Sequence, residues 1–372
     1  LFYALWERAV GAGPARERPA KPAGRIPETP FPSMAPLPFK PYHQSLIFQL
    51  CPNTMPFPFS REEITRSWRP LNWQAFDPLD EVSRRYAEYY GLDFSTEVPD
   101  LEHGFGYFEA AGHTISVHGW RPAVARGTVL ICHGYFDHVG LYRHLIAHVL
   151  ELGYAVLAYD LPGHGLSSGP RAAIQDFRIY REVLEQCLEQ AGNDFPRPWH
   201  VIAQSTGGAI VMDYLLHYGF DADDSPFEQI ILLAPLVRPF KWSTARWLHT
   251  LVRPFAKSIK RVFTVNSGDA DFLDFLENKD PLQYHRLPAG WVTALKKWIP
   301  GFEAANRVKI SPVVIQGDRD ETVDWRHNLG VIRDKFQEPD VHMLNGARHH
   351  LANEHEEYRE KILRIIDRYL AE

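Results

Sequence analysis

The feature that most constrains the fold is an alternation of short apolar runs with amphipathic stretches, which begins at residue 128. The runs are continuous in Val, Ile and Leu, which is typical of strands that are buried on both faces of a parallel sheet. Strands are expected over residues 128–132, 154–159, 199–203, 229–234, 312–316 and 340–344. Helices are expected over 141–150, 177–191, 206–218 and 354–370. The pattern predicts an α/β fold with a mostly parallel sheet and helices on both faces, and a ligand site at the carboxyl edge of that sheet.

Two further segments precede this alternation. Ser60 followed by Glu63 predicts a short capped helix, and a second helix is expected over 78–90, where Gly91 ends it. Residues 106–110 and 113–120 alternate in polarity and predict a hairpin. We therefore expect a core made of residues 43–235 and 311–372, with a helical extension at its N-terminal end.

The beginning of the chain is rich in proline, which disfavours both helices and central strands. We expect residues 1–42 to be a disordered tail. Met34 lies just before the sequence begins to show structural patterns, so we expect the biological start at Met34, with the upstream stretch foreign to the natural protein. A genuine disordered arm is the alternative.

Residues 236–310 interrupt the alternation, because they contain helical fragments but no apolar strand. An insertion of this size above the carboxyl edge of the sheet predicts a cap. Its first part is basic and aromatic, with no acidic residue between 236 and 263. That pattern predicts peripheral contact with an anionic membrane or a phosphate-bearing lipid. An ordinary helix with a solvated polar face is the alternative.

Composition excludes several classes of protein. The net charge of -6 argues against a nucleic-acid binder. The three cysteines, Cys51, Cys132 and Cys187, are too few and odd in number for a disulfide framework, which favours a reducing compartment. No uninterrupted apolar run approaches the roughly 18 residues of a membrane span. We expect a cytoplasmic protein that can lie at the inner face of a membrane.

The strongest local motif is Ala-Gln-Ser-Thr-Gly-Gly at 203–208, between an expected strand and an expected helix. A nucleophile elbow has this layout, since it exposes a serine on a strained turn and needs small neighbours where strand and helix pass closely. Ser205 is therefore the candidate nucleophile, although Ala203 stands where the usual motif has glycine. The alternative is that Ser205 simply caps the helix.

Another loop predicts the groups that would stabilise an oxyanion. His133 and Gly134 directly follow the strand at 128–132. Acyl transfer needs two backbone N–H groups aimed at the carbonyl oxygen as it becomes negative. In an elbow enzyme one belongs to the residue after the serine, here Thr206, and Tyr135 is the best candidate for the other. Alone, His133-Gly134 would be an ordinary turn.

The acid and the histidine of such a triad should follow the serine in that order. The loop after 312–316 offers Asp318, Asp320 and Asp324, and the loop after 340–344 offers His349 and His350. A neutral imidazole would take the serine proton, and a carboxylate would hold the tautomer of that imidazole. The spacing does not choose among these residues.

Together these motifs resemble the α/β-hydrolase superfamily, and within it the monoacylglycerol lipase and lysophospholipase branch, which is grouped with serine aminopeptidases of the S33 type. The resemblance covers roughly 104–370 and rests on the segments 132–142, 159–169, 203–208, 280–282, 316–320 and 346–349. It implies an α/β-hydrolase fold with an inserted helical cap. It also implies Asp320 as the acid and His349 as the base, and hence a triad of Ser205, Asp320 and His349.

The expected activity is hydrolysis of a lipid acyl ester, a lysophospholipid or a monoacylglycerol, without a metal or cofactor and without a nucleic-acid partner. Ala203-Gln204 replaces the usual Gly-His before the serine, so substrate preference carries over less safely than catalysis. One alternative keeps the triad and acts on a small ester, a thioester or a peptide amino terminus. The other is a binding protein that has lost catalysis.

Overall fold

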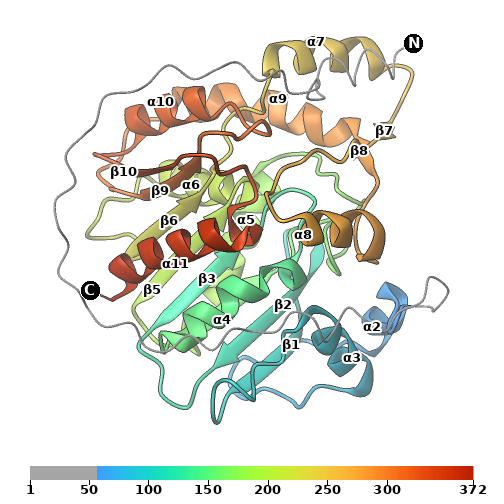
Figure 1. Cartoon of the computed structure of the whole chain (residues 1–372), viewed down its shortest axis with the longest axis vertical. Coiled ribbons are helices and arrows are strands. Elements are labelled where there is room, and N and C mark those ends of the chain that lie inside the picture. Colours follow the sequence, from blue (N-terminus) through green and yellow to red (C-terminus); the bar gives the residue numbers. More distant parts are fainter. Residues whose placement is uncertain (1–56, 372) are drawn as a thin grey trace.

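The computed structural model describes residues 57–371 (Figure 1). The expected tail over 1–42, the start expected at Met34, Cys51 and the first residues of the expected core segment, 43–56, lie outside the described residues.

The centre of the molecule is an eight-stranded sheet with the order β1-β2-β4-β3-β5-β6-β9-β10. The first two strands are antiparallel to each other and β2 is antiparallel to β4, whereas all the remaining neighbours are parallel. The strands are β1 (Glu102–Ala110), β2 (His113–Arg121), β3 (Thr128–Cys132), β4 (Ala155–Tyr159), β5 (Trp199–Gln204), β6 (Gln229–Leu233), β9 (Val313–Gly317) and β10 (Asp340–Leu344). This is the α/β-hydrolase arrangement, which confirms the predicted fold class.

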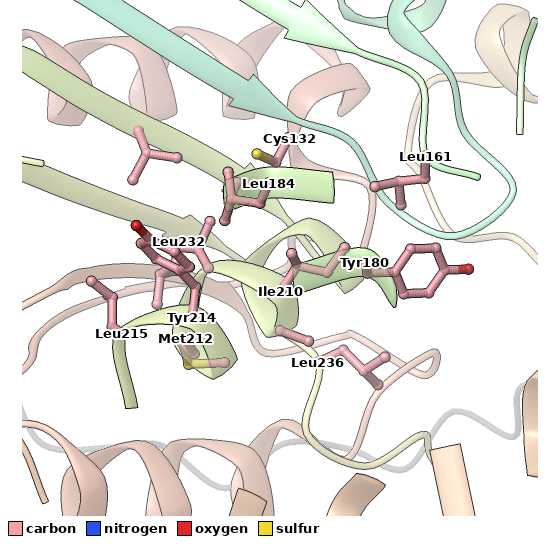
Figure 2. Close-up of a cluster of buried hydrophobic side chains, with 14 of the residues drawn as sticks. Cys132, Leu161, Tyr180, Leu184, Ile210, Met212, Tyr214, Leu215, Leu232 and Leu236 are labelled. Carbon is pink, nitrogen blue, oxygen red and sulfur yellow. The ribbon is translucent and has the colours of Figure 1, made fainter. Parts of the chain in front are cut away.

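Helices cover both faces of the sheet and create two hydrophobic clusters. One cluster joins alternate strand residues to α3 (Glu81–Tyr90), α4 (Arg143–Glu151) and α11 (Glu356–Leu370), and Figure 1 shows the last two in front of the sheet. The other cluster joins the opposite strand residues to α5 (Arg178–Ala191), α6 (Thr206–Tyr218) and α10 (Trp325–Lys335). In Figure 2, Leu184 of α5 and Ile210 of α6 lie near Cys132 at the end of β3. Burial on both faces explains why these strands are apolar without alternation.

The N-terminal part agrees with its local signals. Ser60 and Glu63 form the reciprocal capping box at the start of α2 (Arg61–Ser67), and α3 ends at Gly91 in a left-handed conformation. The structure adds α10, which the sequence pattern did not predict. That helix is mostly polar and buries only four residues, so its periodicity is weak.

Residues 236–310 are inserted between β6 and β9, and we call them the inserted segment. Its helices are α7 (Trp242–Val252), α8 (Ala270–Asp274) and α9 (Ala289–Ala304). The sequence predicted no apolar strand in this segment, and the structure adds a short antiparallel pair, β7 (Ser258–Lys260) and β8 (Arg286–Pro288). These strands are three residues long and mostly polar, so no apolar run marks them. Figure 1 shows α7 and α9 along the top of the view and α8 lower down, between α9 and α3.

Candidate active site

Ser205 lies on the turn between β5 and α6, and its backbone is strained. Its φ of 53° is in the left-handed region, which residues other than glycine rarely adopt. Its N–H donates to Leu233 O at 2.8 Å, and its carbonyl accepts from Leu236 N at 3.0 Å, so β6 and the loop after it hold the turn. A Cβ at Gly207 would lie 2.3 Å from Cys132 O, so only glycine fits between the helix and β3. The residue pattern and the geometry agree on an elbow.

The structure brings His349 and Asp320 to this serine, in one hydrogen-bonded chain. His349 Nε2 lies 2.9 Å from Ser205 Oγ, and His349 Nδ1 lies 2.7 Å from Asp320 Oδ2. A carboxylate only accepts hydrogen bonds, so the Nδ1 proton points to Asp320, and Nε2 accepts from the serine hydroxyl. The three residues are 4–6% exposed, which leaves the serine accessible from one side only.

The other candidates in the same two loops have different partners. Asp318 Oδ1 accepts from Gly346 N at 2.7 Å and thereby joins the two loops. Asp324 caps α10 through His327 N. His350 Nε2 lies 3.2 Å from Asp137 Oδ2. The geometry therefore distinguishes residues that sequence spacing did not.

The loop after β3 lies beside the serine. A Cβ built on Gly134 would lie 3.4 Å from Ser205 Cβ, and Tyr135 and Thr206 both line the cavity described below. Among residues 57–371, neither the Tyr135 N–H nor the Thr206 N–H has a hydrogen-bond acceptor. The Tyr135 hydroxyl donates to Ala172 O at 2.7 Å, so the side chain is anchored on the far side of the loop. Two free amides near a serine hydroxyl are suited to an anionic oxygen.

Supporting contacts hold the chain of three residues in place, and the sequence gave little sign of them. Gln316 Nε2 donates to Asp320 Oδ2 at 3.1 Å, while the amides of Thr322 and Val323 donate to Asp320 Oδ1. Gln204 Nε2 donates to the His349 carbonyl at 2.9 Å. The only sequence signal was the unusual Gln204 in the elbow motif. The acid thus has a hydrogen bond at each lone-pair region, which fixes its orientation toward the imidazole.

Asp137 organises the loop that carries Tyr135. Its Oδ2 accepts from Gly134 N at 3.2 Å and from the Tyr142 hydroxyl at 2.9 Å, and it faces His350. Burial by itself would raise the pKa of this carboxyl, but His350, His133 and Tyr142 lower it far below its usual range. Asp137 is therefore a carboxylate over the whole neutral pH range and keeps the loop closed on the strand end.

A cavity of roughly 300 Å³ opens from Ser205 between the sheet edge and the inserted segment. That volume is at the lower end of the range for small-molecule sites. Its wall is largely apolar, and most of its apolar residues come from the inserted segment: Phe240, Leu273, Leu276, Leu287, Trp291 and Val292. Trp291 of α9 stacks on the Tyr135 ring at a centroid distance of 3.8 Å. The inserted segment therefore forms most of the apolar boundary of the site.

The described part of the chain holds no group of three or more His, Cys, Asp or Glu side chains that could bind a metal ion. In the same part, no helix is both long enough and apolar enough to cross a bilayer.

The chain is similar to known proteins in both sequence and fold. The sequence pattern of the family described as "Serine aminopeptidase, S33" matches residues 123–356. The monoacylglycerol lipase of Mycolicibacterium smegmatis is 28% identical over 277 residues, which cover 69% of this chain and 92% of that protein. The monoglyceride lipase of Rattus norvegicus is 26% identical over 288 residues, which cover 73% of this chain and 90% of that protein.

Solved structures show the same fold. A soluble variant of the Saccharomyces cerevisiae monoglyceride lipase, in complex with a substrate analogue, has a TM-score of 0.60 at 18% identity and covers 73% of this chain and 95% of its own. The Paleococcus ferrophilus monoacylglycerol lipase has a TM-score of 0.58 at 20% identity, with 71% and 98% covered. The chain therefore belongs to the serine aminopeptidase S33 family of the α/β-hydrolase fold, a serine hydrolase family that includes lipases and esterases.

Proposed function

We propose that the protein is a serine carboxylic-ester hydrolase that cleaves the acyl ester of a single-chain lipid, a monoacylglycerol or a lysophospholipid. The observation that carries the proposal is the continuous hydrogen-bonded chain Asp320–His349–Ser205 in the wall of an apolar cavity. Nucleophile, base and orienting acid are each within hydrogen-bond reach of the next, which is the geometric requirement for acyl transfer.

In this mechanism Ser205 Oγ attacks the ester carbonyl carbon while His349 Nε2 takes the hydroxyl proton. The imidazolium that forms is stabilised by Asp320, which stays ionised. The tetrahedral intermediate collapses as its C–O bond to the alcohol breaks, and His349 returns the proton to the leaving alcohol. Water then attacks the acyl-enzyme with His349 as base, releasing the fatty acid and restoring the serine.

The free amides of Tyr135 and Thr206 would bind the carbonyl oxygen as it becomes negative. Asp137 supports this role, because its bonds to Gly134 and Tyr142 keep the loop from turning its amides away. Removing one such donor from an oxyanion hole typically costs about 10²- to 10³-fold in kcat.

Two observations favour a lipid acyl group over a small polar acid. The cavity wall is largely apolar, and the curated relatives at 26–28% identity are named monoacylglycerol or monoglyceride lipases. An apolar cavity stabilises an acyl chain by roughly 0.8 kcal/mol for each CH₂ that it buries.

We further propose that the inserted segment acts as a cap and contacts a membrane surface. Trp247 on α7 is 64% exposed and Phe255 beyond it is 87% exposed, with Leu251 between them at 42%. The cations Arg246 and Arg253 accompany them on the same stretch. Exposed aromatic residues beside cations suit the headgroup region of an anionic bilayer.

A substrate panel tests the proposed function. The purified protein is offered 1-oleoylglycerol, 1-oleoyl lysophosphatidylcholine, p-nitrophenyl butyrate and an alanine p-nitroanilide, and it is labelled with a fluorophosphonate probe. We expect hydrolysis of the long-chain esters and labelling that disappears in Ser205→Ala. Hydrolysis of the anilide alone would favour an aminopeptidase. Absence of both labelling and hydrolysis would favour a binding protein.

A further inference from the structure

The cavity wall contains a cation that the ester hydrolysis does not use. Arg261 directly follows β7, lines the cavity with Ser205, and is half-buried. Its guanidinium lies between two rings, 4.0 Å from the Phe136 centroid and 4.4 Å from the Phe263 centroid. Phe136 is the residue after Tyr135, so the charge is held close to the loop that would carry an oxyanion donor.

Only one side of this guanidinium has partners in the protein. Nη1 donates to Gln283 Oε1 and lies 3.5 Å from the Tyr284 carbonyl. Among residues 57–371, neither Nε nor Nη2 of Arg261 has a hydrogen-bond acceptor. These two atoms are not fully buried, whereas the unpaired Nε of Arg238 is. The Nε–Nη2 edge is therefore open, and two parallel N–H groups of this kind recognise phosphate or carboxylate in a bidentate way.

No carboxylate in the described part of the chain lies within 4.0 Å of Arg261. The side-chain amide of Gln283 connects Arg261 to Asp280, since its Oε1 accepts from Arg261 and its Nε2 donates to Asp280 Oδ2 at 3.0 Å. Asp280 is already occupied by His138 at 3.1 Å and by the Tyr90 hydroxyl. Asp137 also lines the cavity, but its carboxylate is held by Gly134 N, the Tyr142 hydroxyl and His350. Glu277 and Glu321 line it as well, and both are exposed to solvent. Arg261 thus makes no direct ion pair, although the carboxylates of Asp137 and Asp280 favour its charged form from a longer distance.

A half-buried guanidinium with unpaired N–H groups and no direct ion pair gains from a ligand that accepts those hydrogen bonds. Burial lowers the pKa of Arg261 to about 10, a value still high enough for full charge at neutral pH. A neutral monoacylglycerol has no anionic group that could accept hydrogen bonds from Nε and Nη2. A phosphate on the glycerol of the leaving alcohol would lie a few bonds from the reacting carbonyl and could accept both free N–H groups.

We propose that Arg261 is the anion-binding residue of this pocket, which binds a phosphate on the alcohol part of the substrate and so selects lysophospholipids over monoacylglycerols. This inference rests on the proposed ester hydrolysis and names the substrate class for it. The recognised chemistry is an anionic group with two acceptor oxygens, and its source is the headgroup side of the lipid. The released fatty carboxylate is the competing source.

The test compares 1-oleoylglycerol with 1-oleoylglycerol 3-phosphate, which differ only in the phosphate. Both are presented at a low mole fraction in the same neutral detergent micelles, so that the carrier interface is the same for both. The variants are Arg261→Gln, Arg261→Lys and, as the matched control, Lys257→Gln, which removes an exposed cation just before β7 that does not line the cavity. Melting temperatures are recorded for all of them.

We expect Arg261→Gln to lower kcat/KM for the phosphate ester by roughly 10- to 100-fold, the scale of a bidentate charged hydrogen bond. The kcat/KM for 1-oleoylglycerol should change by less than about threefold, and Arg261→Lys should lose part of the effect because it keeps charge without the planar fork. Lys257→Gln should change kcat/KM for neither substrate beyond the same threefold limit. An equal loss on both substrates, or no loss on either, overturns the proposal.

Two further measurements distinguish a failure of the Arg261 proposal from a failure of the proposed ester hydrolysis. Binding of 1-oleoylglycerol 3-phosphate is titrated on Ser205→Ala with and without Arg261→Gln, which needs no hydrolysis and so remains readable if the proposed function is wrong. Inhibition by oleate is measured on the Arg261 variants. Relief of oleate inhibition with an unchanged substrate preference would assign the anion to the fatty carboxylate and contradict the proposal. If Arg261→Gln does not fold, the same ratios are read from Arg261→Lys.

Discussion

The carboxyl edge of the sheet and the inserted segment meet at one cavity, but they satisfy their polar groups differently. At the sheet edge, Asp320 has four hydrogen-bond donors around its carboxylate, and Ser205, Asp320 and His349 are all buried. In the inserted segment, Arg261 has an open edge and α7 exposes Trp247. The side chains of the triad have their hydrogen-bond partners within the protein, whereas the inserted segment leaves a cationic edge and an aromatic ring available.

That difference separates two tasks. Proton transfer needs groups held at fixed distances before the substrate arrives, because reorganisation during the reaction is costly. Recognition of a lipid needs apolar surface and charge that remain unpaired until a ligand or an interface covers them. We therefore expect substitutions at the sheet edge to change the rate of chemistry, and substitutions in the inserted segment to change which substrate or surface is bound.

The largest effect is expected at the nucleophile. Ser205→Ala should reduce esterase activity by roughly 10⁴-fold or more, because the whole catalytic group acts through this hydroxyl. Ser95→Ala, an exposed serine in the loop after α3, is the control and should retain full activity. Hydrolysis by Ser205→Ala at nearly the rate of the control would show that Ser205 is not the nucleophile. The proposed division of tasks between the two regions would then be wrong.

The acid loop provides a sharper test, since two aspartates lie two residues apart. Asp320→Asn should lower kcat by on the order of 10⁴-fold, because an amide favours the wrong imidazole tautomer. Asp318→Asn removes the charge but keeps an oxygen that can accept from Gly346 N, so a loss of less than about tenfold is expected. Steady-state kinetics on both variants check this. Equal losses would show that the loop, and not the carboxylate facing His349, sets the rate.

The junction between the two regions is a buried ion pair, His138–Asp280. Burial would raise the pKa of Asp280, but His138 lowers it. Burial would lower the pKa of His138, but the carboxylates of Asp280, Asp160 and Asp137 raise it. Asp280→Asn should therefore destabilise the protein by about 3 kcal/mol, as expected for a buried charge that loses its partner. Thermal unfolding of both proteins measures this.

The two pKa shifts also fix the pH dependence of that loss. The lowered pKa of Asp280 contributes stability above its unfolded pKa of about 3.9, which is lost as the pH falls through the folded value. The raised pKa of His138 contributes fully below about 6.5 and is lost as the pH rises through its folded value. The destabilisation should be larger at pH 5.5 than at pH 9. Asp274→Asn, at the exposed pair with Lys279, is the control and should change nothing.

The smallest effect is expected on the surface of the inserted segment. The double substitution of Trp247 and Phe255 by Ala should weaken binding to anionic vesicles by about tenfold, because two exposed rings would no longer enter the interface. Hydrolysis of micellar p-nitrophenyl butyrate should stay constant. Tyr218→Ala, an exposed aromatic residue on α6, is the control for co-sedimentation. Unchanged binding in the double variant would mean that this face is not the membrane contact.

Much of the fold could be read from local patterns. The strands of the sheet are continuously apolar because helices cover both of its faces. Polar residues and glycines in the sequence mark where these strands end. Ser60 and Glu63 predicted their cap because capping is a contact between residues three apart. The weakly periodic α10 and the pair β7–β8 were missed, since each is stabilised by its neighbours more than by its own pattern.

The candidate site divides in the same way. The sequence by itself determined the elbow around Ser205, because the strained turn and the tight strand–helix crossing demand small residues at fixed positions. It left three aspartates and two histidines equivalent, and only the resemblance to a family distinguished them. The tertiary structure decided that Asp320 and His349 face Ser205, and that Arg261 lines the same cavity while its Nε and Nη2 have no acceptor among residues 57–371. The physical reason is that these contacts join residues far apart in the chain, whose distances are set by packing of the whole sheet and not by local spacing.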